Sequence, residues 1–129
     1  MNLWVDDLRD PLIYGKVTHD RLDWVWAKSV GEAAQYLLKE GVERVSLDHD
    51  FEHQKYNGED LIHWMSKHNR WPTKGIALHS SNVHGLTNMS KLLVKLSPFS
   101  PTGLYQWGDF SASAEVNPPK SKEEKNKKK

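Results

Sequence analysis

Short apolar runs separated by longer amphipathic stretches set the pattern of this chain. The runs are rich in β-branched and aromatic side chains, which is typical of buried strands. The runs occupy residues 2–5, 24–27, 44–47 and 75–78. Apolar residues at helical spacing occupy residues 30–40, 58–68 and 84–96. Strand and helix therefore alternate, which predicts an α/β fold with one parallel sheet and helices on both of its faces.

Capping signals support two of the predicted helices. Ser29 and Glu32 have the spacing of a capping box, in which the serine accepts from the glutamate amide and the glutamate reaches back. Asn57 can cap the next helix, and the sequence Trp71-Pro72 is expected to end it. These signals fix the two helices on either side of the third predicted strand.

Two segments lack such signals. Residues 8–23 carry Pro11, Gly15 and scattered charges without a helical period, so we expect a loop with at most a degenerate helix. Residues 103–107 are candidates for a fifth strand or a packed extension. From residue 111 onward nothing favours regular structure, so we expect one domain over residues 1–110 and a disordered, lysine-rich tail over residues 111–129.

Charge is distributed unevenly along the chain. The 129 residues carry a formal net charge of +1, but six of the eighteen basic residues are lysines within residues 120–129. Without that segment, twelve basic side chains stand against fifteen acidic ones, so the predicted domain is mildly acidic. We interpret the tail first as a solubilising end, with a weak, salt-sensitive contact to nucleic acid as the alternative.

Composition excludes several classes of site and partner. Because the chain has no cysteine, it has no disulfide, no thiolate metal site and no cysteine nucleophile. No apolar run is long enough for a membrane span, and the first residues lack the pattern of a signal peptide. We therefore expect a cytoplasmic protein without a membrane partner, while its oligomeric state stays open.

Polar clusters follow three of the predicted strands at the point where each strand ends. The clusters are Asp6-Asp7, Asp48-His49-Asp50 and His79-Ser80-Ser81-Asn82. In a flavodoxin-like strand order the first and third strands are central neighbours, and the fourth lies beside the third. We therefore expect the four carboxylates of the first two clusters to meet, with the third cluster alongside. Like charges at close range need a bound cation or a raised pKa, which favours chemistry over packing.

A set of carboxylate oxygens suits a hard divalent cation. Asp6, Asp7 and Asp48 are the expected ligands, and Mg²⁺ is the preferred ion because it keeps several waters and leaves room for a phosphate. The carboxylate majority and the lack of cysteine argue against zinc. His49 and His79 keep Mn²⁺ as an alternative.

Four motifs occur in order over roughly residues 1–96. They are Leu3-Trp4-Val5-Asp6-Asp7-Leu8-Arg9-Asp10-Pro11, Ser46-Leu47-Asp48-His49-Asp50-Phe51, Gly58-Glu59-Asp60-Leu61-Ile62-His63-Trp64 with Trp71-Pro72, and His79-Ser80-Ser81-Asn82 with Gly85 and Met89. Together they resemble the cyclic-phosphate processing receiver-like domains, small relatives of the response-regulator receiver fold. The resemblance implies a receiver-type sheet, a divalent-metal phosphoryl site and action on a cyclic phosphate of a nucleotide or an RNA end.

Set against ordinary receivers, this sequence keeps some site positions and lacks another. Asp6 and Asp7 match the acidic pair, Asp48 matches the phosphoacceptor and Ser80 matches the hydroxyl residue after the fourth strand. No lysine matches the one that follows a fifth strand in receivers. Because that lysine pairs with the acyl phosphate, its lack puts phosphoacceptor signalling in doubt.

The predicted function is a metal-dependent phosphoesterase acting on a cyclic or terminal phosphate of a nucleotide or RNA. The candidate catalytic residues are Asp48, His49, Asp50 and His79. The candidate phosphate-binding residues are Arg9, Ser80 and Asn82. Water activated by the metal or by Asp50 could attack phosphorus while His79 or His49 protonates the leaving ribose oxygen. Alternatively, Asp48 could attack first and form an acyl phosphate that water then clears, and the sequence leaves both routes open. The alternative function is a non-catalytic receiver-like module that binds a nucleotide or phosphorylated partner as a switch or inhibitor.

Overall fold

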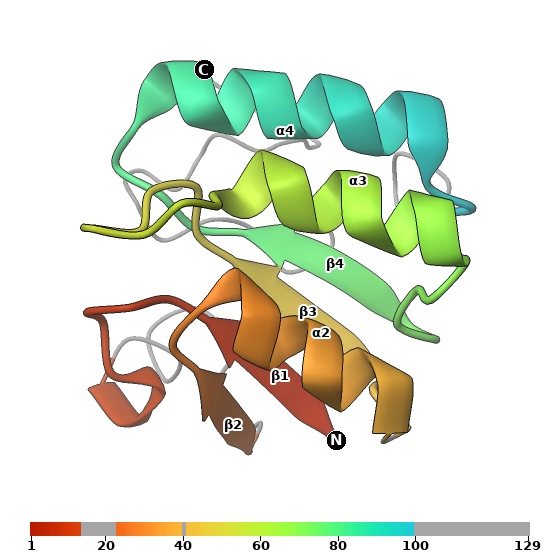
Figure 1. Ribbon diagram of the computed structural model, residues 1–129, viewed down its shortest axis with the longest axis horizontal. Helices are drawn as coiled ribbons and strands as arrows, with labels where there is room; N and C mark the ends of the chain where they lie inside the picture. Colours follow the sequence, from red (N-terminus) through yellow and green to blue (C-terminus); the bar gives the residue numbers. More distant parts are fainter. Residues whose placement is uncertain (14–22, 40, 100–129) are drawn as a thin grey trace, which may run out of the picture.

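The computed structural model describes residues 1–13, 23–39 and 41–99, and it contains the four predicted strands and three predicted helices (Figure 1). The elements are β1 (Asn2–Val5), β2 (Trp24–Ala27), α2 (Val30–Lys39), β3 (Arg44–Leu47), α3 (Gly58–His68), β4 (Gly75–Leu78) and α4 (Val83–Leu96). Residues 11–13 form a short helical turn, in keeping with the degenerate first crossover. The candidate fifth strand, the domain boundary near residue 110 and the lysine-rich tail lie outside the described residues.

The strands form one parallel sheet in the order β2-β1-β3-β4. This order confirms the predicted receiver-like sheet, because β1, β3 and β4 are successive neighbours and each carries a polar cluster at its end. The register aligns Val5 with Leu47 and Leu47 with Leu78. The residues that follow these three therefore emerge at one edge of the sheet.

The helices form a layer on the sheet. Figure 1 shows α2 and α3 lying over one face of the strands, with α4 beside α3. Alternate strand residues face this layer and form the core with it, including Leu3, Val5, Val45, Leu47, Ile76 and Leu78. The helices α2, α3 and α4 lie on this face, so the expectation of helices on both faces stays a prediction for the described part of the chain. No helix among the described residues is long and apolar enough to cross a membrane.

The helix ends follow the capping signals with two differences. Ser29 caps α2 by accepting from the Glu32 amide at 3.0 Å, but the Glu32 carboxylate reaches back to the Lys28 amide rather than to Ser29. Asn57 forms the predicted cap of α3. This helix ends at Asn69, which adopts a left-handed conformation with φ of 53°, so the stop precedes the expected Trp71-Pro72.

Candidate functional site

Backbone pairing continues one residue beyond the strands and brings the polar clusters together. The Asp48 amide donates to the Val5 carbonyl at 3.0 Å, and the His79 amide donates to the Leu47 carbonyl at 2.9 Å. The Asp6 amide bonds in the same way to the end of β2. The sheet hydrogen bonds therefore fix the backbone positions of Asp6, Asp48 and His79. This restricts where their side chains can reach before any ligand binds.

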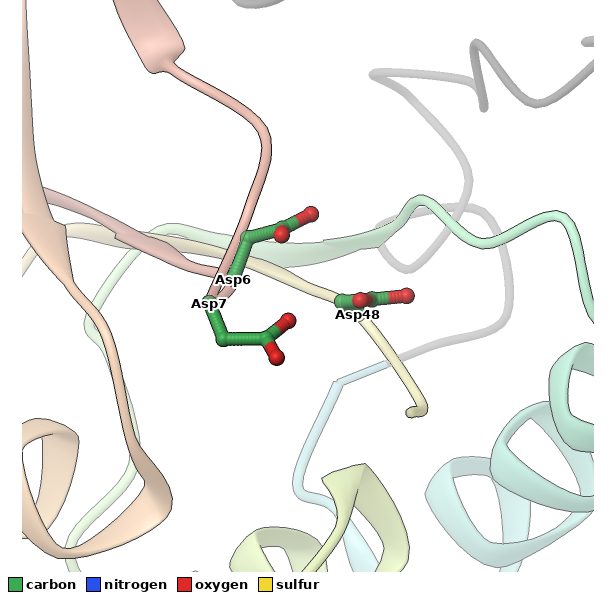
Figure 2. Close-up of side chains that lie close together, drawn as sticks. All are labelled: Asp6, Asp7 and Asp48. Carbon is green, nitrogen blue, oxygen red and sulfur yellow. The ribbon is translucent and has the colours of Figure 1, made fainter. Parts of the chain in front are cut away.

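Three carboxylates gather at this edge (Figure 2). One oxygen each from Asp6, Asp7 and Asp48 lies within 4.8 Å of the others, so the three expected ligands come together. Asp6 and Asp48 are buried, whereas Asp7 is half-buried. The expectation that Asp50 joins them is wrong, because its side chain is 61% exposed and bonds instead to His49 and Asn82.

The Asp6 carboxylate is held as an anion by three hydrogen-bond donors. Its Oδ1 accepts from the amides of Leu8 and Arg9 at 2.8 and 2.9 Å, and its Oδ2 accepts from His79 Nε2 at 2.9 Å. Burial alone would favour the neutral acid. The hydrogen bonds from His79 and from the two amides outweigh burial and lower the pKa of Asp6.

His79 lies beneath the carboxylates rather than facing the solvent. Its Nδ1 lies 2.7 Å from the Ser46 hydroxyl, its ring stacks on Trp4 at 4.0 Å, and only 1% of it is exposed. Burial lowers the pKa of His79, so the neutral ring donates to Asp6 and accepts from Ser46. Both ring nitrogens are thus engaged inside the protein. This placement suits orientation of Asp6 and does not suit the expected transfer of a proton to a leaving group.

The carboxyl group of Asp48 has a strongly raised pKa. Burial, and then the charge of Asp6, raise the pKa of Asp48 to about 7. The amide of His49 and the hydroxyl of Ser80 donate to its carboxylate but offset only part of this effect. Asp7 differs, since its Oδ2 accepts from the Glu52 amide at 2.7 Å near the surface. An added positive charge would therefore bind most strongly beside Asp48.

One arginine lies among these acids. Arg9 Nη1 is 3.6 Å from Asp6 Oδ2 and 3.8 Å from Asp48 Oδ1, and its Nη2 donates to the Ser81 hydroxyl at 3.4 Å. The predicted phosphate-binding arginine therefore contacts two of the three clustered carboxylates.

His49 forms a clamp between two other carboxylates. Its Nδ1 lies 2.6 Å from Asp50 Oδ1, and its Nε2 lies 2.6 Å from Glu59 Oε2. Burial opposes the charged ring, but the two carboxylates raise the pKa of His49 above its ordinary value. Because carboxylates only accept, both ring nitrogens must donate, and the ring is an imidazolium. His49 thus ties the loop after β3 to α3, which does not suit the expected role of a mobile proton donor.

The remaining predicted residues are structural partners of the acids. The buried Ser80 hydroxyl accepts from the Asn82 amide at 3.0 Å while it donates to Asp48. Asn82 caps α4 by accepting from the Gly85 amide, and its Nδ2 donates to both oxygens of Asp50. The polar atoms of Ser80 and Asn82 are therefore already committed, and contact with a phosphate would require exchange of these bonds.

Three contributors escaped prediction. Glu59 completes the His49 clamp, Ser46 fixes the His79 ring and Ser81 contacts Arg9. The contribution of Ser46 to the site could have been predicted. It precedes Asp48 by two positions and pairs in register with Trp4, so it lies on the same sheet face. Glu59 carried no such signal, since nothing in the sequence specifies how α3 turns toward the loop.

The donor set fits a hard divalent cation. All three converging ligands are carboxylates, and the raised pKa of Asp48 reports first its burial and then the nearby charge of Asp6, which the protein donors do not fully offset. Oxygen ligands alone favour Mg²⁺ or Mn²⁺ over softer ions. The two histidines of the site are turned toward Asp6, Asp50 and Glu59.

Comparison with known protein families identifies the family of this chain. The cyclic-phosphate processing receiver domain matches residues 1–95, which is most of the chain. The chain belongs to this family. The match confirms the resemblance carried by the four motifs. Receiver domains commonly bind Mg²⁺ through acidic residues, and this receiver domain presents such a cluster. No curated protein matches the chain in sequence.

Solved structures agree on the receiver fold. The signal receiver domain of a LuxO repressor protein from Vibrio parahaemolyticus has 18% identity, a TM-score of 0.54 and coverage of 70% of each chain. A CheY-like response regulator receiver domain from Methanospirillum hungatei JF-1 has 15% identity and a TM-score of 0.54, covering 78% of this chain and 82% of its own. Identities this low support the architecture alone.

Replacing Asp48 by asparagine should stabilise the protein in EDTA, and more so at high pH. The folded pKa of about 7 exceeds the ordinary value of 3.8, so ionisation in the folded state costs stability as the pH rises from 4 to 7. Thermal or urea unfolding should show Asp48→Asn gaining about 1–3 kcal/mol at pH 8 and little at pH 4. The exposed Asp23→Asn serves as the control and should gain nothing. Equal stability of Asp48→Asn and wild type at pH 8 would contradict the raised pKa of Asp48.

Replacing Gly85 by alanine should destabilise the protein although alanine favours helices. A Cβ at this position would lie only 2.7 Å from His49 Nδ1, inside contact distance of a ring held by two carboxylates. We expect a loss of about 1–3 kcal/mol in urea unfolding. Gly31→Ala is the matched control in α2, where the nearest atom lies 3.9 Å away, and it should be neutral or stabilising. Similar results for both variants would show that His49 is not packed as described.

Proposed function

We propose that this receiver domain is a metal-dependent phosphoesterase that hydrolyses a cyclic phosphate of a nucleotide or an RNA end, with Mg²⁺ as its cation. The convergence of Asp6, Asp7 and Asp48 within 4.8 Å carries this proposal. No lysine of the sequence matches the receiver lysine that pairs with an acyl phosphate, which argues against phosphoacceptor signalling, and Arg9 beside Asp6 and Asp48 offers a cation for phosphate. Membership of a cyclic-phosphate processing family supports the choice of substrate.

The three carboxylates would hold Mg²⁺, with the remaining positions left to water and phosphate oxygens. When bound, the ion supplies charge neutralisation at the phosphate and lowers the pKa of bound water. The hydrogen bonds to Asp6 fix that carboxylate so that it keeps one geometry through the reaction. His79 and Ser46 therefore act as positioning residues behind the ligands.

Phosphate recognition falls to groups on the exposed side of the carboxylates. Arg9 is partly exposed and can donate from two nitrogens to phosphate oxygens, which matches the geometry of an anionic phosphodiester. Ser81 is exposed beside the guanidinium and adds a hydroxyl donor. The first turn of α4 begins two residues later, and its amides favour negative charge.

Hydrolysis of a cyclic ester breaks one phosphorus–oxygen bond, adds hydroxide to phosphorus and returns a proton to the ribose oxygen. Asp50 is an exposed carboxylate in the loop after β3, and it is held by His49 and Asn82. A carboxylate fixed in this way can orient a water toward phosphorus. The alternative in which Asp48 attacks first gives the same products through an acyl phosphate.

The same fold would also serve a module that binds a nucleotide or phosphorylated partner without turnover. The committed hydrogen bonds of His49 and His79 favour that second function, because both histidines predicted to protonate the leaving oxygen are occupied. Turnover is therefore the property that separates the two functions. For an RNA substrate, the lysine-rich tail would add only a weak, salt-sensitive contact.

A substrate screen tests the proposal. The full chain is incubated with 2′,3′-cyclic nucleotides, 3′,5′-cyclic nucleotides and RNA ending in a 2′,3′-cyclic phosphate, in Mg²⁺ or Mn²⁺. We expect hydrolysis of one class, its loss in EDTA, and a fall of about 10²-fold or more in Asp48→Asn. Asp23→Asn lies at the start of β2, away from the site, and should retain full activity. Binding of a cyclic nucleotide without turnover in any condition would replace the enzyme with the binding module.

A further inference from the structure

The side chain of Arg9 occupies the electrostatic position that a divalent cation would take. Its Nη1 lies 3.6 Å from Asp6 Oδ2 and 3.8 Å from Asp48 Oδ1, and both acids belong to the carboxylate cluster. A guanidinium at this range neutralises part of the charge that would attract Mg²⁺. Two cations within about 4 Å of the same carboxylates also repel each other strongly at a partly buried site.

The base of this side chain is fixed while its end faces alternative partners. The Arg9 amide donates to Asp6 Oδ1 at 2.9 Å, and its carbonyl accepts from Trp4 Nε1 at 2.8 Å. Beyond this anchor the side chain is 27% exposed, and Nη2 already reaches the exposed Ser81 hydroxyl. The guanidinium can therefore shift from the carboxylates toward Ser81 without any movement of the backbone.

We propose that Arg9 is a built-in counter-ion that competes with Mg²⁺ for Asp6 and Asp48 and moves to the phosphate when the metal binds. This inference rests on the proposed metal site and deepens it. In the absence of phosphate, the displaced guanidinium stays close to the metal and weakens its binding. A bound phosphate gives the guanidinium an anionic partner, so the repulsion is offset and both ligands bind more tightly.

Arg9 therefore couples the two ligands of the site. By thermodynamic linkage, phosphate raises the affinity for Mg²⁺ by the same factor by which Mg²⁺ raises the affinity for phosphate. A direct contact between metal and phosphate gives some coupling by itself. Arg9 adds to this coupling in a particular way, because it lowers the affinity for the metal alone as well as raising the affinity for the pair.

The test measures Mg²⁺ binding rather than catalysis. Isothermal titration of MgCl₂ into the full chain is carried out with and without inorganic phosphate, on wild type, Arg9→Ala, Arg9→Gln and Arg9→Lys. Arg9→Gln keeps a donor for Ser81 and guards against a fold that fails in Arg9→Ala, and circular dichroism checks both. Arg44→Ala is the matched control, since Arg44 is 23% exposed and pairs with Glu43 at the opposite end of β3.

Without phosphate, Arg9→Ala and Arg9→Gln should bind Mg²⁺ about 5- to 20-fold more tightly than wild type. In these two variants the gain in Mg²⁺ affinity caused by phosphate should shrink by a similar factor, while Arg9→Lys and Arg44→Ala should resemble wild type. Unchanged or weaker Mg²⁺ binding in both neutral variants would overturn the inference.

The binding readout separates this inference from the proposed function. The expected Mg²⁺ behaviour in a protein that hydrolyses nothing would support the role of Arg9 and overturn the phosphoesterase. Lack of Mg²⁺ binding in all five proteins would overturn both, because the inference requires the metal site.

Discussion

Repulsion between buried carboxylates is the constraint that organises this site. The parallel register places Asp6 and Asp48 at the ends of adjacent strands, where neither can move away without breaking sheet hydrogen bonds. Each acid meets this constraint differently. Asp6 is stabilised as an anion by fixed donors, whereas Asp48 responds with a pKa raised to about 7. The fold therefore holds Asp6 and Asp48 close enough to repel each other, and a bound cation would offset this repulsion.

Two layers of polar contacts support that arrangement on either side of the sheet edge. His79 and Ser46 fix Asp6 from the sheet face that carries Trp4. On the helical side, His49 joins the loop after β3 to Glu59 of α3. The carboxylates of this receiver domain are thus flanked by His79 and His49. The ring nitrogens of both histidines bond to groups inside the protein rather than facing the solvent.

Much of this architecture could be predicted because its signals are local. Apolar runs located each strand, and the capping residues Ser29 and Asn57 located the starts of two helices. Strand order followed from the flavodoxin-like arrangement expected of alternating strands and helices, and with it the meeting of the carboxylates at the ends of the strands. The partners of the histidines could not be predicted, because side-chain direction decides them. Asp50 follows Asp48 by two residues, yet the chain has left the strand there and turns it outward.

The central claim is that Asp6, Asp7 and Asp48 together hold a divalent cation. Anomalous diffraction from crystals of the full chain grown with Mn²⁺ tests this most directly, since Mn²⁺ scatters anomalously and takes the same oxygen ligands. The account predicts one strong peak coordinated by carboxylate oxygens of all three residues. A crystal with no peak between these residues, or with Mn²⁺ bound only elsewhere on the protein, would contradict it.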